Sequence, residues 1–66
     1  MDLQKSVKVG FALKGGSQED MSGYLKKSPA TVSKYLNGKI DPPYSVVVAM
    51  CDYFSVPMSI FCGWSE

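Results

Sequence analysis

The sequence predicts an all-α protein, a compact bundle of about five short helices with a central helix-turn-helix. Three observations lead to this fold class. At 66 residues the chain is long enough for one domain, 1–66. Gly and Pro divide it into five short segments, without a repeat or a linker. Within these segments apolar residues recur every three or four positions, which is the period of a helix.

The first segment, 3–13, is predicted to be a helix. Asp2 can act as its N-cap, and Gly15 with the glycine after it can end it. Apolar residues that recur every four positions give the segment one apolar face: Leu3, Val7 and Phe11. Residues 7–11 also alternate as in a strand, so a strand is the alternative for this stretch.

The second segment begins at Ser17, which is followed three positions later by Asp20, a spacing close to that of a capping box. The Ser17 hydroxyl would accept a hydrogen bond from a free amide of the first turn. The carboxylates of Glu19 and Asp20 suit the positive end of the helix dipole. Apolar residues at i, i+3 and i+4 then give a short apolar stripe: Met21, Tyr24 and Leu25. Tyr24 is expected at the edge of the core.

The third segment opens with Ser28 as N-cap and Pro29 at the first helical position, where the missing N–H would have no partner. Gly38 can adopt positive φ and end the helix after Asn37. The predicted inward stripe is Val32, Tyr35 and Leu36. Only residues 26–28 separate this helix from the second one, so the two must meet at a sharp bend.

The fourth segment follows Asp41 and two prolines, of which Pro43 can sit in its first turn. Its core stripe has the spacing i, i+3, i+4 and i+7: Val47, Met50, Cys51 and Phe54. The valines at 46–48 favour a strand as the competing interpretation, but the segment length and the continuing period favour a helix. Pro57 ends this helix, and residues 58–62 are predicted to form a last short one.

A helix, a three-residue turn and a second helix form the geometry that presents the second helix to a DNA major groove. Residues 17–38 resemble the helix-turn-helix of the Cro/repressor family, also called XRE. The stretch 54–61 is similar to the ending of that family, so the resemblance covers about residues 6–62. The matching features are Ser17-Gln18 at the start of the second helix, the apolar-small pair Met21-Ser22, the tight turn at Lys26-Lys27, and Asn37-Gly38 after the third helix.

The sequence departs from the family pattern at two places. The family usually has Gly in the turn where Lys26 stands, so Lys26 would have to accept a positive φ at some cost in strain. The family often pairs an Arg of the first helix with a Glu near the end of the third. Phe11 and Leu36 occupy those places here, which we interpret as an apolar contact in place of an ion pair.

The resemblance implies DNA-contacting roles that are assigned residue by residue. The positions that face base edges in the family are Pro29, Ala30, Ser33 and Lys34, and they also point outward if the apolar stripe of the third helix is buried. Lys34 is the only long donor among them and therefore the best candidate to read guanine, whereas Pro29 and Ala30 could contact a thymine methyl. The expected phosphate contacts are Gln18, Lys26, Lys27, Ser28, Thr31, Asn37 and Lys39.

Composition excludes several other functions. The chain has no His and two Cys, which are too few ligands for the usual zinc sites. Without His it also lacks the Ser–His or Cys–His pair of common hydrolases. We therefore expect no enzymatic activity, no metal and no cofactor. The start lacks the apolar stretch of a secretory signal and no run is long enough to span a membrane, so a cytoplasmic protein with free thiols at Cys51 and Cys62 is expected.

Together these observations predict a sequence-specific, double-stranded DNA-binding regulator. The short chain favours a Cro-like repressor of phage or bacterial origin that binds operator half-sites as a dimer, without a membrane or a small-molecule ligand. The alternative is a protein-interaction module of the same fold, such as an antitoxin or anti-activator. The net charge of only +1 slightly favours this alternative.

Several apolar residues have no obvious inward place, including Val46 and Val48, which lie off the main stripe of the fourth segment. A small core does not readily leave so much apolar surface in water. The sequence therefore predicts a two-fold interface at the C-terminal end, with Trp64 as its aromatic anchor. The alternative is that Trp64 folds back onto its own core. The predicted interface residues are Tyr53, Ile60, Cys62 and Trp64.

Overall fold

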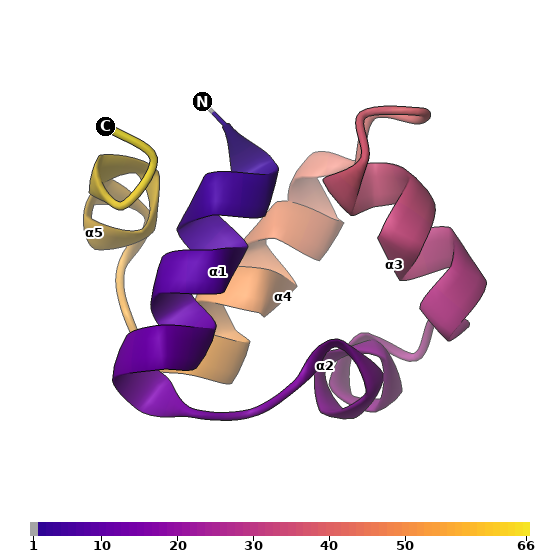
Figure 1. Cartoon of the computed structure of the whole chain (residues 1–66), viewed down its shortest axis with the longest axis horizontal. Helices are drawn as coiled ribbons and strands as arrows, with labels where there is room; N and C mark the ends of the chain where they lie inside the picture. Colours follow the sequence, from indigo (N-terminus) through magenta and orange to yellow (C-terminus); the bar gives the residue numbers. More distant parts are fainter. Residues whose placement is uncertain (1) are drawn as a thin grey trace.

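The computed structural model describes residues 2–66, which form five helices and no strand (Figure 1). This confirms the predicted all-α class and rules out a strand at 7–11 and at 46–48. None of the helices in residues 2–66 is long and apolar enough to cross a membrane. The helices are α1 (Leu3–Lys14), α2 (Gln18–Leu25), α3 (Pro29–Leu36), α4 (Tyr44–Phe54) and α5 (Met58–Gly63).

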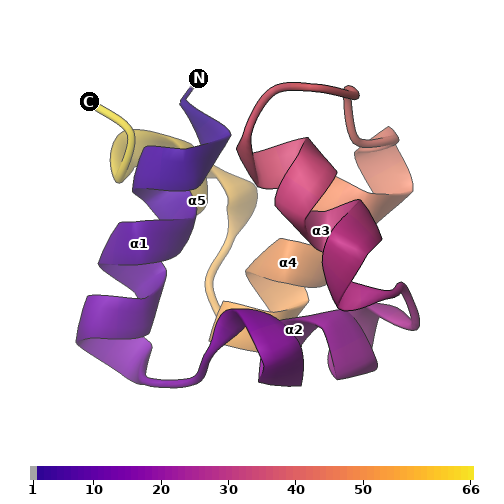
Figure 2. The ribbon, with the colours of Figure 1, turned by 45° about the vertical axis from the view of Figure 1, so that its right-hand side comes forward.

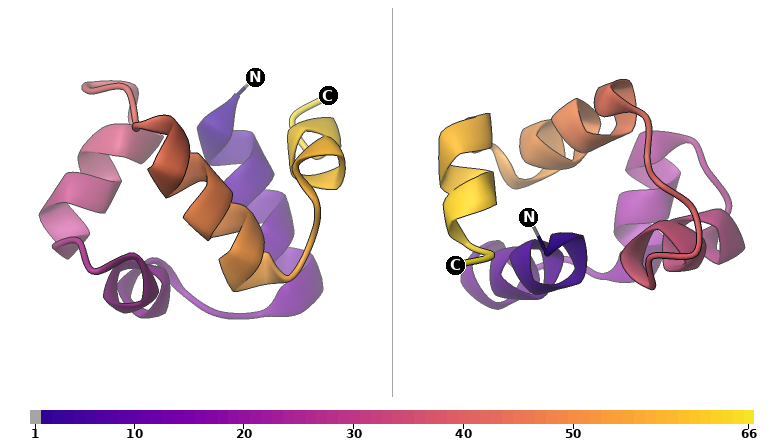
Figure 3. Two further views of the ribbon diagram at one scale, coloured as in Figure 1. Left: turned by 180° about the vertical axis from the view of Figure 1, so that it is seen from behind. Right: turned by 90° about the horizontal axis from the view of Figure 1, so that it is seen from above.

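The five helices surround one core, with α1 and α4 in the middle of the molecule (Figure 1). Helix α2 packs against α3 and α4, while α5 packs against α1 and α4. Helices α3 and α5 therefore lie at opposite ends, which the views from behind and from above also show (Figure 3). The start of α1 and the C-terminal end of the chain lie near each other (Figure 1).

The starts of the first three helices are capped as the sequence predicts. At each of them, a side-chain oxygen accepts a hydrogen bond of 3.1 to 3.2 Å from the backbone N–H three residues later. The capping residues are Asp2, Ser17 and Ser28. Pro43 immediately precedes α4 instead of lying in its first turn, because its backbone is extended, with ψ at 154°.

The ring of Phe54 is buried at the centre of an aromatic cluster. Four other rings have their centroids 5.1 to 6.2 Å from it, and they come from α1, from α4 and from the α5 end of the chain: Phe11, Tyr53, Phe61 and Trp64. Leu36 of α3 packs against the same core. Apolar packing thus occupies both positions at which the family that the sequence resembles often has an ion pair.

The buried face differs from the predicted one at two helices. Tyr24 is 53% exposed and packs against the tilted ring of Tyr53 with ring centroids 5.5 Å apart, so it lies at the edge of the core as expected. The small Ser22, outside the predicted stripe, is buried, and its hydroxyl donates to the Gln18 carbonyl at 2.6 Å. In α4, Val46 is buried and Val47 only half-buried, because this helix is covered by both α2 and α5.

Both cysteines are free thiols, as expected. Cys51 is buried in α4, and its Sγ lies 3.8 Å from the Sδ of Met58 at the start of α5. Burial is the main reason why the pKa of the Cys51 thiol is raised, and the nearby Cys62 and Asp52 raise it further. Cys51 therefore stays protonated and serves as a packing residue.

A pair of glycine substitutions tests how tightly Phe54 is held. A Cβ added at Gly10 would lie 2.7 Å from the Phe54 ring, which is itself enclosed by other rings, whereas a Cβ at Gly23 meets nothing within 4 Å. We expect Gly10→Ala to lower the free energy of unfolding by about 1–3 kcal/mol through overpacking. Gly23→Ala should raise it by up to about 1 kcal/mol, because alanine is the better helix former. Thermal melts followed by circular dichroism compare the two, and equal effects would contradict this account.

Candidate nucleic-acid interface

The turn between α2 and α3 sets the angle between these two helices. Lys26 adopts the left-handed conformation, φ 57° and ψ 38°, as the departure from the usual Gly requires. Its backbone N–H bonds the Gly23 carbonyl at 3.2 Å, and the N–H of Lys27 bonds the Ser22 carbonyl at 3.1 Å. These bonds close α2 and direct the chain into α3 within three residues.

A second contact joins the starts of the two helices. The Gln18 side chain, at the first position of α2, donates from Nε2 to the Pro29 carbonyl at the first position of α3, at 3.5 Å. Figure 2 shows the result, with α3 at the front of the molecule and α2 crossing beneath it. The end of α2 is therefore closed by the turn, and the starts of α2 and α3 are joined directly.

The outer face of α3 carries the side chains that the sequence predicts to read bases. Pro29, Ala30 and Lys34 are exposed, and Ser33 is half-buried. The opposite face is closed by Val32 and Tyr35, which are buried. The structure thus brings the four predicted base-reading residues together on one accessible helix face.

Hydroxyl and amide groups line both ends of α3. At its start, the Ser28 and Thr31 hydroxyls lie 2.9 Å apart in a hydrogen bond. At its end, the Asn37 Nδ2 donates to the Ser33 Oγ at 3.2 Å. A nucleic-acid backbone that passes over α3 would therefore meet hydrogen-bonding groups at both ends of the helix.

Four of the seven lysines lie in or beside α3, between residues 26 and 39, and all four are exposed. Lys39 is held by its own backbone, because its N–H donates to the Lys34 carbonyl at 3.0 Å. Glu19 and Asp20 are the only acids within residues 17–39. The local charge is therefore positive although the whole chain is close to neutral, which suits a polyanionic partner.

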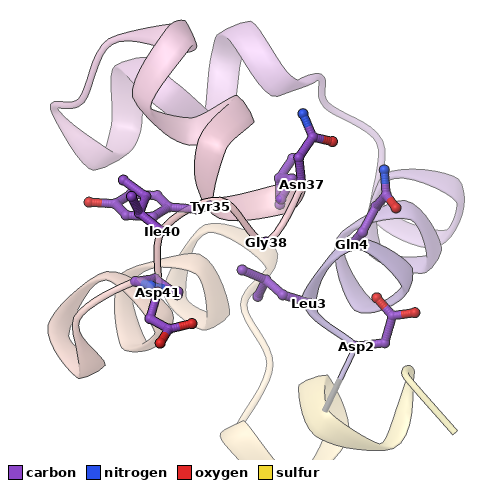
Figure 4. Close-up of a pocket in the computed structure, with 10 residues that line it drawn as sticks. Asp2, Leu3, Gln4, Tyr35, Asn37, Gly38, Ile40 and Asp41 are labelled. Atoms are coloured by element: carbon purple, nitrogen blue, oxygen red, sulfur yellow. The ribbon is translucent and has the colours of Figure 1, made fainter.

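The sequence did not predict a cleft of about 460 Å³ beside this surface, between the start of α1 and the α3–α4 loop. Figure 4 shows Leu3 between its two walls, with the Gln4 and Asn37 amides pointing the same way. No sequence spacing connects residues 2–4 with residues 35–42, so only the fold brings them together. Within residues 2–66 no group of three or more Cys, Asp or Glu side chains is placed to hold a metal ion.

The residues predicted to form a dimer interface lie away from α3, on α4, α5 and the residue that follows α5. Trp64 packs edge-on against Phe54 and Phe61, with centroids 5.8 and 6.1 Å apart, so its ring folds back onto its own core as in the stated alternative. Tyr53 stacks within the same cluster. Ile60 remains 48% exposed, and a dimer interface at this end stays a prediction.

Comparison with known proteins agrees with this geometry. The chain matches a family model, HTH_3, described as helix-turn-helix, over residues 12–61. The matched range runs from the last turn of α1 into α5 and contains every residue assigned above to DNA contact. No curated protein and no solved structure is significantly similar to the chain.

Within residues 2–66, two residues other than glycine have a positive φ: Lys26 at the end of α2 and Ser55 at the end of α4. The left-handed conformation costs a non-glycine residue about 1–2 kcal/mol. We expect Lys26→Gly and Ser55→Gly each to raise the free energy of unfolding by up to about 1 kcal/mol, after the greater entropy of glycine in the unfolded chain is subtracted. Urea denaturation measures both, and a loss of stability in either variant would show that its side chain makes a compensating contact.

Proposed function

We propose that this chain, which belongs to the XRE-type helix-turn-helix family of DNA-binding regulators, is a Cro-like repressor. In this proposal it binds operator half-sites as a dimer in the cytoplasm of a bacterial host. The observation that carries the proposal is the outer face of α3, where four predicted base-reading side chains lie together and lysines flank both ends. Such a face fits a major groove about 12 Å wide.

Base reading is assigned to Lys34, Ser33 and the two residues at the start of α3. The Lys34 ammonium offers donors that suit the O6 and N7 acceptors of guanine. Pro29 and Ala30 lack hydrogen-bonding side chains and suit the methyl group of thymine. The chain has no long side chain with a bidentate fork on this face, so we expect discrimination to be spread over several weak contacts.

Phosphate contact is assigned to residues around both ends of α3 and at the start of α2. Their ammonium, hydroxyl and amide groups are exposed or half-buried, and they position the helix without reading sequence. The residues are Gln18, Lys26, Lys27, Ser28, Thr31, Asn37 and Lys39. Gln18 also bonds α3 directly, so it would couple a phosphate contact to the placement of the reading helix.

Two-fold symmetry is part of the proposal because α3 has only eight residues and offers few base contacts. A pair of half-sites one helical turn apart doubles these contacts. The predicted pairing surface is Tyr53, Ile60, Cys62 and Trp64. Since the rings of Tyr53 and Trp64 pack within the fold, Ile60 has the most surface to offer.

The second candidate is a protein-interaction module, an antitoxin or an anti-activator. Tyr44 is 75% exposed and Leu13 is also largely exposed, and apolar side chains of this kind suit a protein partner. An electrophoretic shift with genomic fragments at fixed salt separates the two candidates. Specific binding supports the repressor, whereas no preference over competitor DNA supports the interaction module.

Lysine substitutions separate base reading from phosphate contact. Lys34→Ala should reduce discrimination at one base step per half-site by roughly 1–3 kcal/mol. Lys27→Ala should weaken binding about equally on all sequences and lower the salt slope by about one. Competition between an operator and its single-base variants measures the first effect. An unchanged order of preference in Lys34→Ala would remove this residue from base reading.

A matched pair of isoleucines locates the dimer interface. Ile60 of α5 is 48% exposed, and Ile40 in the α3–α4 loop is 42% exposed. We expect Ile60→Ser to reduce cooperative binding to paired half-sites while affinity for a single half-site is retained, because only the apolar contact between copies is lost. Ile40→Ser serves as the control, and the two are compared by titration of DNA with one or two half-sites. If Ile40→Ser alone reduced cooperativity, the copies would pair through the α3–α4 loop.

A further inference from the structure

We propose that Asn37 is a positioning residue that fixes Ser33 as a hydrogen-bond donor toward the DNA bases. The inference rests on the proposed function, because it concerns how the outer face of α3 discriminates between bases. It adds a role for Asn37 beyond phosphate contact, and it predicts which bases can form a hydrogen bond with Ser33.

The first step concerns how serine hydroxyls in helices usually bond. A serine within a helix commonly donates its proton to the carbonyl four residues earlier. Ser22 of α2 does this, since its hydroxyl donates to the Gln18 carbonyl at 2.6 Å. Such a serine has given its only proton to its own helix and can offer only lone pairs to a partner.

Ser33 is placed differently. The carbonyl four residues before it belongs to Pro29, and this oxygen accepts a hydrogen bond from the Gln18 side chain at 3.5 Å. The Ser33 Oγ is itself an acceptor, for the Asn37 Nδ2 at 3.2 Å. No hydrogen bond recorded among residues 2–66 uses the Ser33 proton as donor. The proton is therefore free for a partner outside the chain.

Asn37 is itself held by the backbone. Its N–H donates to the Ser33 carbonyl at 2.9 Å, as the C-cap of α3, so two bonds join the same two residues. An amide NH₂ group has two N–H donors, of which one bonds Ser33 and the other remains for a phosphate. Asn37 can thus couple a contact with a DNA phosphate to a contact with a base.

The consequence for sequence recognition follows from the groups in the major groove. With one lone pair bonded to Asn37 and its proton free, Ser33 suits the acceptors of guanine, thymine and adenine better than the N4 donor of cytosine. We expect cytosine to be disfavoured on the contacted strand at this position. A single neutral hydrogen bond contributes roughly two- to tenfold in affinity, which sets the size of the preference.

The test begins with selection and sequencing of sites bound by the wild-type chain, followed by titration of all four bases at each position. Ser33→Ala identifies the position at which the preference against cytosine is lost. Asn37→Ala should flatten the preference at that same position, and should add nothing there in the Ser33→Ala background. Thr31→Ala is the control, since loss of a phosphate contact should weaken binding to all four bases equally.

The isosteric Asn37→Asp gives a sharper test. Its carboxylate can only accept hydrogen bonds, so the Ser33 hydroxyl would donate to it. The hydroxyl could then offer only lone pairs to a base. The preference at this position should then turn toward the amino groups of cytosine and adenine. Charge repulsion from the new carboxylate lowers affinity for every sequence alike and does not change this order. Melting curves confirm that each variant is folded at the temperature of the titration.

The outcomes distinguish this inference from the proposed function. If Asn37→Ala weakened binding to all four bases equally, or added to Ser33→Ala at the same position, Asn37 would contact phosphate only and the inference would be wrong. An unchanged order of bases in Asn37→Asp would contradict it as well. A wild-type chain without any sequence preference would instead overturn the proposed repressor, and the inference with it.

Discussion

Helices α1, α4 and the α5 end of the chain meet at the ring of Phe54, and the position of α3 depends on that contact. The ring lies close against Gly10 of α1, where no side chain could fit between them. The rings of Phe61 and Trp64 cover it from the α5 end. With α4 fixed in this way, α2 packs on α4 and α3 packs on α2. The orientation of the proposed reading helix thus depends on packing that lies outside the helix-turn-helix itself.

Sequence reasoning located the helices and their ends because the relevant interactions are local. Each cap at Asp2, Ser17 and Ser28 joins residues three positions apart. The positive φ of Lys26 was implied by the resemblance, because the family usually has Gly at this place in the turn. The four predicted base-reading residues come from the resemblance to the XRE family, and the inward-facing apolar stripe of α3 agrees with that assignment.

Features that depend on contacts between distant residues were not predictable in the same way. Ser6 looks like a surface residue in the sequence, yet it is buried and donates to the Phe61 carbonyl at 2.8 Å, across 55 positions. The apolar stripe of α2 does not include Ser22, yet this serine is buried, so helical period alone did not find it. The bond between Asn37 and Ser33 is local, but its direction depends on side-chain rotamers, which a residue pattern does not specify.

Trp64 is the only tryptophan in the chain, and its ring is partly buried against Phe54 and Phe61. Indole fluorescence responds to the polarity and packing around the ring. The emission of this protein therefore reports on the docking of the C-terminal residues onto the aromatic cluster. Because α3 lies at the opposite end (Figure 1), DNA bound to a single half-site does not touch this ring, whereas unfolding, or pairing of two copies through the predicted interface, changes its surroundings. The native chain therefore carries a label-free signal for these two events.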